Sequence, residues 1–190
     1  YVPGEQPRFD GMIKLNTNEN PYPPAPGVQK ALREMEAGQL KLYPDPGAGM
    51  LVDALAEYYQ LGRDQIFVGV GSDDVLAMSF LTFFNSAKPV VFPDITYSFY
   101  EVWASLFRIP FRTPALDEEF HIRKEDYYGE NGGIVIANPN APTSVCEGIE
   151  VIEDIIRHNP GCVVIVDEAY IDFGGVSARS LLETYDNLLV

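Results

Sequence analysis

The sequence contains few residues of the types that build metal sites or disulfide frameworks. Only two of its 190 residues are cysteine, Cys146 and Cys162, and only two are histidine, His121 and His158. No CxxC pair and no cluster of cysteine with histidine occurs, so the spacing favours neither a zinc site nor a disulfide framework. The chain also lacks any apolar run close to the ~20 residues that a membrane span needs. It begins without a basic segment followed by an apolar stretch, so we expect no signal peptide.

Basic residues are scarce as well. Lysine and arginine number 13 against 28 aspartate and glutamate, which gives a formal net charge of −15. Nucleic-acid affinity comes largely from cations that neutralise phosphates, so this balance argues against nucleic acid and against anionic membrane surfaces as partners. Hydrophobic residues make up 46% and charged residues 22%, which is typical of a globular protein. We expect a cytoplasmic protein of one large domain, or of one domain plus a piece, at roughly 150 residues per domain.

The pattern of apolar residues predicts an arm followed by an alternating α/β domain. Residues 1–27 are rich in proline and glycine and show no hydrophobic period, which predicts an extended N-terminal arm. Residues 28–190 read as one domain. Helices are expected near 28–35, 51–59, 75–83, 97–106, 148–158 and 177–183, and strands near 66–70, 89–92, 108–112, 133–137, 162–166 and 188–190. Short apolar strands separated by helices predict a three-layer α/β/α fold with a mostly parallel sheet.

Ligands of such sheets bind beyond the carboxyl ends of the strands, and several turns there carry suitable residues. Gly71 and Ser72 follow strand 66–70, where Ser72 is expected to cap a helix whose first amides could cradle a phosphate. An ordinary helix start explains the same residues. Tyr97, after strand 89–92, could offer its ring to a flat ligand or simply pack in the core.

Two further turns carry amides and acids. Strand 133–137 runs into a loop with two asparagines and two prolines, an irregular segment that presents amide side chains beyond the sheet. Strand 162–166 is followed by Asp167, Glu168 and Tyr170. A buried acid at a strand end is costly unless it is paired, so Asp167 needs a cationic partner, either in the protein or in a ligand.

These turns together carry a resemblance to a known family. The matching stretches are NTNENPY (16–22), YPD (43–45), GVGSDD (69–74), PDITY (93–97), NPNAPT (138–143) and VDEAY (166–170). In this order and spacing they resemble the pyridoxal-phosphate (PLP) aminotransferases of fold type I, and most closely the histidinol-phosphate branch of that family. The resemblance implies that residues 28–190 are part of the large cofactor-binding domain and that the small C-terminal domain is missing.

The resemblance also implies roles for the cofactor-facing residues. Asp167 would pair with the protonated pyridine nitrogen of PLP, which keeps the ring an electron sink. Tyr170 would bond to the 3-oxygen of the ring, and Tyr97 would stack on it. The phosphate would lie on the turn formed by Gly71, Ser72 and Asp73.

Other implied roles concern the substrate and a second subunit. Tyr43 resembles a tyrosine that reaches the phosphate of the neighbouring subunit, so a homodimer is expected. Asn20 and Tyr22 would border the substrate pocket. The implied reaction moves an amino group from a small-molecule amino donor, histidinol phosphate in this branch, to a 2-oxo acid, in histidine biosynthesis.

The sequence departs from the family pattern in two places. Ala141 stands where the family commonly has the asparagine that contacts the 3-oxygen, and Ser144 replaces a glycine. The candidates for that contact are then Asn140, Asn138 or Tyr170 alone. The second departure concerns the lysine that forms a Schiff base with the cofactor. No lysine of the chain has the family context; the lysines are Lys14, Lys30, Lys41, Lys88 and Lys124. We therefore expect the chain to stop before the Schiff-base lysine and to be inactive alone.

Other interpretations share these motifs. A threonine-phosphate decarboxylase or another class II aminotransferase would carry the same residues. A non-catalytic protein on the same scaffold would lack the lysine but has no reason to keep a buried acid. A nicotinamide-dependent dehydrogenase is disfavoured because the third glycine of its fingerprint is absent.

Overall fold

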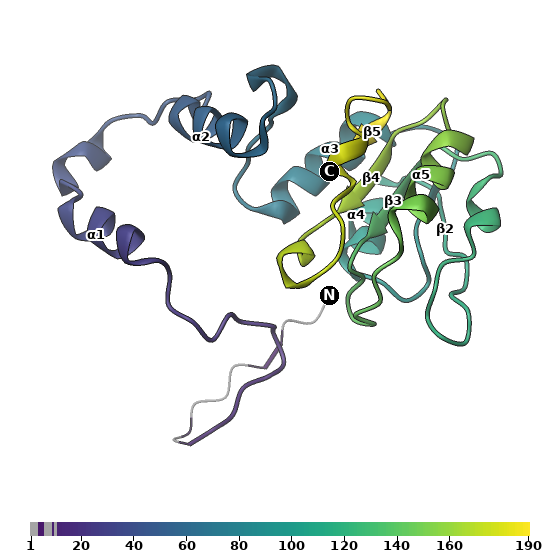
Figure 1. The fold of residues 1–190 in the computed structure, drawn as a ribbon, viewed down its shortest axis with the longest axis horizontal. Helices are drawn as coiled ribbons and strands as arrows, with labels where there is room; N and C mark the ends of the chain where they lie inside the picture. Colours follow the sequence, from purple (N-terminus) through teal and green to yellow (C-terminus); the bar gives the residue numbers. More distant parts are fainter. Residues whose placement is uncertain (1–3, 6–8, 10) are drawn as a thin grey trace. The chain divides into compact units, whose positions relative to one another are not determined.

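The computed structural model describes residues 4–5, 9 and 11–190, which fall into two compact units, one ending at Val68 and the other running over Gly69–Val190 (Figure 1). The predicted division into an arm, 1–27, and a domain, 28–190, stays a prediction, and residues 1–3, 6–8 and 10 of that arm lie outside the described residues. No described helix combines the length and the apolar character needed to cross a bilayer.

The second unit is built on a five-stranded sheet in the order β2-β1-β3-β4-β5. All four pairings are parallel. The strands are β1 (Val90–Val91), β2 (Phe111–Arg112), β3 (Gly133–Ala137), β4 (Val164–Asp167) and β5 (Leu188–Leu189). Because every strand points the same way, the carboxyl ends of β3 and β4 meet at one edge, where Ala137 is in register with Asp167.

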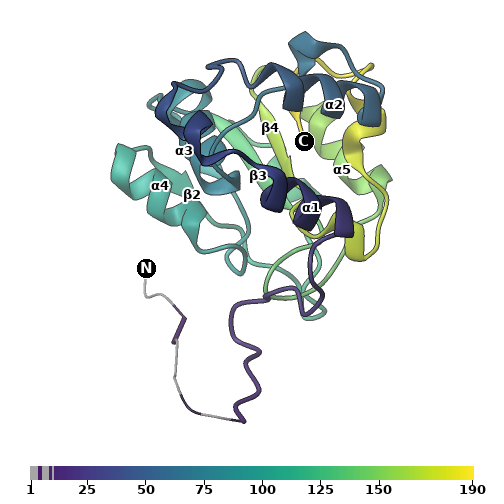
Figure 2. The same ribbon diagram turned by 90° about the vertical axis from the view of Figure 1, so that its left-hand side faces the viewer.

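Helices cover both faces of this sheet, as Figure 2 shows. On one side lie α3 (Ser72–Phe83) and α4 (Phe99–Phe107), and on the other lies α5 (Ile149–His158). Side chains of β3 alternate between the two faces because of the pleat. Val135 and Ala137 join the core under α3 and α4, whereas Ile134 and Ile136 join the core under α5. The predicted three-layer α/β/α fold with a parallel sheet is confirmed.

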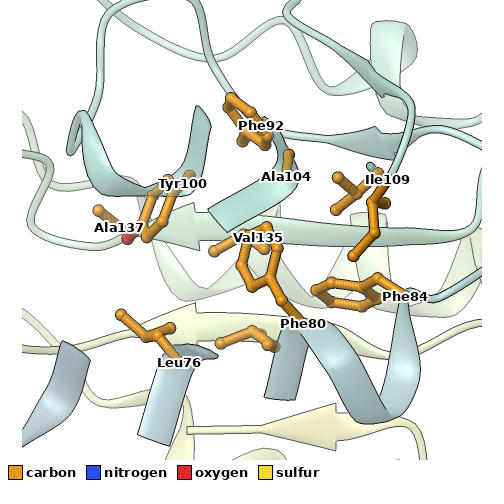
Figure 3. Close-up of a cluster of buried hydrophobic side chains, with 11 residues drawn as sticks. Leu76, Phe80, Phe84, Phe92, Tyr100, Ala104, Ile109, Val135 and Ala137 are labelled. Carbon is orange, nitrogen blue, oxygen red and sulfur yellow. The ribbon is translucent and has the colours of Figure 1, made fainter. Parts of the chain in front are cut away.

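The core under α3 and α4 is rich in aromatic side chains (Figure 3). Phe80, Phe84 and Tyr100 are fully buried there. The Phe80 ring stands edge-on to Phe84 at 5.2 Å between centroids and lies parallel to Tyr100 at 6.4 Å. These rings fix where α4 lies on the sheet, and with it the side chains at the start of α4.

The first unit contains helices α1 (Pro26–Glu34) and α2 (Gly49–Tyr59). Both were predicted from their apolar spacing, and proline at the first turn of α1 suits a helix start because its missing N–H has no partner there. Short 3-10 helices complete the description: Ala37–Lys41, Arg63–Gln65, Lys124–Tyr127, Ile171–Phe173 and Ala178–Leu181.

Two predicted elements do not form. Residues 66–70 are not a strand: the Ile66 amide bonds to the Arg63 carbonyl and the Val70 amide to the Asp74 carboxylate, so these amides have local partners only. A strand needs a neighbouring strand to pair with, and no described segment pairs with this one. The predicted helix over 177–183 is one 3-10 turn, Ala178–Leu181.

Candidate functional site

A cavity opens at the carboxyl edge of the sheet, where sequence reasoning placed the site. It lies beyond the ends of β3 and β4 and at the start of α3. Its lining residues are Ser72, Tyr97, Ala137, Pro139, Ala141, Asp167, Ala169 and Tyr170. The fold therefore brings together four of the predicted cofactor residues, which are Ser72, Tyr97, Asp167 and Tyr170.

Asp167 ends β4 with a half-buried carboxylate. Its Oδ2 accepts a hydrogen bond from the Tyr100 hydroxyl at 2.7 Å, and its Oδ1 accepts one from the Ala169 amide at 3.1 Å. Both donors are neutral, and no ion pair of the described residues includes Asp167. The cation that this carboxylate needs is thus absent from the described part of the protein, and the cavity is where a ligand can supply it.

The start of α3 supplies an anion site in the same cavity. Gly71 is the N-cap residue, with φ of 89° and open space where a side chain would stand. Ser72 is therefore the first helical residue, and the prediction that it caps the helix is wrong by one position. The amides of the first turn have no carbonyl partner within the helix and carry partial positive charge. A phosphate or carboxylate is the natural partner for them.

Tyr97 connects this helix start to the helix that follows it in the chain. Its hydroxyl donates to Asp73 Oδ1 at 2.9 Å. Its ring is edge-on to Tyr100, with centroids 5.7 Å apart and planes at 80°, and it lies nearly parallel to Phe99 at 5.5 Å. Because the ring is held by these contacts and also lines the cavity, it offers a rigid aromatic surface to a flat ligand.

The loop after β3 is held by its two asparagines. The Asn138 side chain is buried and clasps Glu147, accepting from its amide at 2.8 Å and donating to its carbonyl at 3.2 Å. Asn140 donates to the Ile95 carbonyl and the Thr143 hydroxyl, both at 2.9 Å, and accepts from Thr96 at 2.8 Å. Neither asparagine is among the cavity-lining residues, so their side chains shape the loop that carries Ala141.

The turn after Asp167 contains Tyr170, which lines the cavity, and Glu168, which stabilises the following turn. Tyr170 lines the cavity, and its ring lies 6.4 Å from that of Phe173. Glu168 accepts bonds from the Ser177 hydroxyl and the Ala178 amide, both at 2.6 Å. Burial raises the pKa of Glu168, although these two bonds favour its charged form. Glu168 therefore fastens the next turn of the chain, while Asp167 faces the cavity.

Three predicted residues belong to the first unit. Asn20 Oδ1 accepts a bond from the Tyr22 amide at 3.0 Å. The side chains of Tyr22 and Tyr43 are exposed. Their expected contacts with substrate and with a second subunit stay predictions.

Sequence reasoning missed Tyr100. It is fully buried, yet its hydroxyl reaches the one acid that faces the cavity. Its spacing was a usable signal, because residues three apart share a face of the predicted helix 97–106, although α4 itself begins only at Phe99.

The site defines a class of coenzyme-binding α/β domain. The residues fit a ligand that carries a phosphate, a flat ring and a cationic ring atom, because an anion cradle, an aromatic surface and an unpaired carboxylate line one cavity. Within the described residues, no three side chains of the metal-binding types gather into a group that could hold a metal.

Comparison with known proteins identifies the family. The sequence profile of aminotransferase class I and II matches residues 10–190, and the chain belongs to that family. It is 52% identical over its whole length to histidinol-phosphate aminotransferase of Lactococcus lactis subsp. cremoris (strain MG1363) and 53% identical to that of Pseudomonas putida (strain W619). The chain spans 53% and 55% of these relatives, about half their length.

Solved structures share the fold. Histidinol-phosphate aminotransferase of Sinorhizobium meliloti in complex with pyridoxal-5'-phosphate superimposes with a TM-score of 0.81 at 23% identity, over 90% of this chain and 49% of that one. L-threonine-O-3-phosphate decarboxylase of Porphyromonas gingivalis gives 0.73 at 18% identity, over 85% and 51%. At such identities the likeness concerns the fold, which is that of the fold type I PLP enzymes.

Proposed function

We propose that this chain is the cofactor-binding half of a PLP-dependent histidinol-phosphate aminotransferase, which moves an amino group from histidinol phosphate to a 2-oxo acid such as 2-oxoglutarate. One observation carries the cofactor assignment: a half-buried carboxylate without an ionic partner among the described residues faces a cavity shared with a helix N-terminus and two tyrosine rings. The substrate assignment is supported by the relatives that are 52–53% identical over the whole chain.

Each residue then has a task in binding. The turn formed by Gly71, Ser72 and Asp73 holds the phosphate through backbone amides, and Tyr97 lies against the ring. Tyr170 donates to the 3-oxygen. Ala141 has no polar atom for that contact, so Tyr170 bears it alone, and Asn140 acts only through the shape of its loop.

Asp167 sets the charge of the ring. An adjacent carboxylate raises the pKa of a pyridine-type nitrogen by about 1–3 units, so the nitrogen stays protonated at neutral pH. Bound in this way, PLP supplies an electron sink for the substrate carbon that loses its proton. The chain's own contribution is to hold the carboxylate, the phosphate cradle and the flanking tyrosines in fixed positions.

The lysine and one tyrosine of the complete site come from outside this chain. A lysine beyond Val190 would attach the cofactor and move the proton, and Tyr43 of a second subunit would complete the phosphate site in a homodimer. Asn20 and Tyr22 border the substrate. A cytoplasmic location stays a prediction from composition.

The test uses the chain extended to the length of its relatives. After addition of PLP, we expect a visible absorbance band from lysine-bound cofactor that borohydride abolishes, and amino transfer from histidinol phosphate to 2-oxoglutarate. The present 190 residues alone are the matched control and should show no transfer. An extended chain that contains no lysine able to bond the cofactor would refute the proposal, and release of carbon dioxide from threonine phosphate would favour the decarboxylase instead.

A further inference from the structure

Tyr100 is enclosed by aromatic rings, and its hydroxyl points at the carboxylate that lines the cavity. Its side chain is fully buried. Phe92 and Tyr97 stand edge-on to its ring with centroids at 5.8 and 5.7 Å, and Phe80 lies parallel to it at 6.4 Å. Rings on several sides leave the hydroxyl no freedom to swing, so it stays directed at Asp167 Oδ2, 2.7 Å away.

The two bonds to Asp167 fix the plane of the carboxylate. An ionised carboxylate has about four lone-pair positions. Tyr100 uses one on Oδ2 and the Ala169 amide uses one on Oδ1, at 3.1 Å. With each oxygen tied to the protein, the carboxylate cannot rotate freely, and its remaining lone pairs are available to the cavity that Asp167 lines.

The hydroxyl is also a constant donor. Burial in the first place, and then the charge of Asp167, raise the pKa of Tyr100 well above its usual range. The phenol therefore keeps its proton at neutral pH. A bond of 2.7 Å from a neutral hydroxyl lies at the upper end of the range for charge-assisted bonds to a carboxylate.

A second tyrosine, Tyr97, contacts Tyr100 and connects it to the start of α3. Tyr97 and Tyr100 stand three residues apart, and their rings touch edge-on. Tyr97 bonds to Asp73 in the first turn of α3, and Tyr100 bonds to Asp167 at the end of β4. One short segment thus ties together the phosphate end and the ring-nitrogen end of the proposed cofactor site.

We propose that Tyr100 is a positioning residue, whose hydroxyl keeps the Asp167 carboxylate aimed at the ring nitrogen of the cofactor. The role rests on the function proposed above, but its effect on the carboxylate can be measured without cofactor.

The experiment compares Tyr100→Phe with Tyr127→Phe in the extended chain. Tyr127 is a matched control because it too is fully buried, on the opposite face of the sheet, and its hydroxyl has no hydrogen-bond partner among the described residues. Without cofactor, the orientation of the Asp167 carboxylate is compared in crystal structures of the parent and the two variants. We expect the carboxylate to leave its parent orientation, or to occupy more than one, in Tyr100→Phe and to stay unchanged in Tyr127→Phe.

A second readout uses bound PLP labelled with nitrogen-15. In Tyr100→Phe the ring-nitrogen signal should move toward that of the unprotonated ring, and in Tyr127→Phe it should not move. A folded Tyr100→Phe protein in which the Asp167 carboxylate keeps its orientation would overturn the role of Tyr100. If instead no variant, nor the parent, binds PLP, the proposed function fails, while the carboxylate orientations still decide whether Tyr100 positions Asp167.

Loss of the fold in Tyr100→Phe would be answered by 3,5-difluorotyrosine at position 100. This residue keeps the ring and the hydroxyl but is a stronger donor, so the ring-nitrogen signal of bound PLP should move toward that of the protonated ring, opposite to the change expected in Tyr100→Phe. An unmoved signal, or one that moves toward the unprotonated ring, would contradict the proposal.

Discussion

Asp167→Asn separates the function of the site from its stability. The substitution keeps the shape of the side chain and an oxygen that accepts a hydrogen bond, but it removes the negative charge. In the parent protein that charge is half-buried and receives only neutral donors, Tyr100 at 2.7 Å and the Ala169 amide at 3.1 Å. The fold therefore loses part of two hydrogen bonds and is relieved of an unpaired charge.

These effects on stability oppose each other. Hydrogen bonds to charged groups contribute about 1.5–3 kcal/mol, whereas the partial burial of a charge without an ion partner has a desolvation cost that acts in the opposite direction. We expect the free energy of unfolding without cofactor to change by less than about 1.5 kcal/mol. The cofactor loses more, because its protonated ring nitrogen loses a stabilisation of roughly 1.4–4 kcal/mol.

The assay measures amino transfer and thermal unfolding of the extended chain side by side. Turnover by Asp167→Asn should fall about 10- to 1000-fold, while the unfolding temperature without cofactor stays within a few degrees. The neighbouring Glu168→Ala is the control and should show the reverse pattern, because it strands the Ser177 hydroxyl and the Ala178 amide that Glu168 accepts from. Turnover that survives Asp167→Asn unchanged would refute the role assigned to this carboxylate.

Three further predictions concern stability. Phe80→Ala empties a fully buried position and should lower the free energy of unfolding by about 3–5 kcal/mol in a denaturant titration; a loss under 1 kcal/mol would contradict the packing described. Hydrogen bonding, chiefly from Tyr128, lowers the pKa of Asp154 to about 2. The ionised Asp154 therefore contributes its full stabilisation of the fold above the unfolded pKa of about 3.9, and this contribution is lost as pH falls toward 2. The stability gap between the parent and Asp154→Asn should close over that range, and a constant gap would disprove the linkage. The hydrogen bond to Glu147 raises the pKa of His121, so this pair stabilises the fold fully below about pH 6.5 and less as pH rises through the folded pKa. His121→Gln should remove this pH dependence from the free energy of unfolding, and a dependence that persists would contradict the role of the pair.

Much of the site could be predicted because its residues follow strands directly. Asp167, Tyr170 and Tyr97 stand in turns after apolar runs, and a parallel sheet gathers such turns at one edge. Asn140 shows where this reasoning ended. The resemblance made it a candidate for a contact with the cofactor, which stays a prediction; what the sequence could not give is that the side chain bonds to Ile95, Thr96 and Thr143 of the surrounding loops.

Element boundaries failed where pairing partners decide them. The run 66–70 has the composition of a strand but remains irregular, because backbone hydrogen bonds of a strand depend on a neighbour and not on the run itself. The N-cap of α3 is Gly71, one residue before the predicted Ser72, because this position has a positive φ. Glycine tolerates a positive φ and serine does so much less readily.

The sequence by itself determined the layered α/β fold and the edge of the sheet where the site lies, since apolar periodicity and turn residues are local properties of the chain. Only the tertiary structure decided that Asp167 is held by Tyr100, which lies 67 residues earlier, and that Tyr97 bonds to Asp73. Such contacts depend on how α4 packs against the sheet through its buried rings, and packing between distant segments leaves no periodic trace in the sequence.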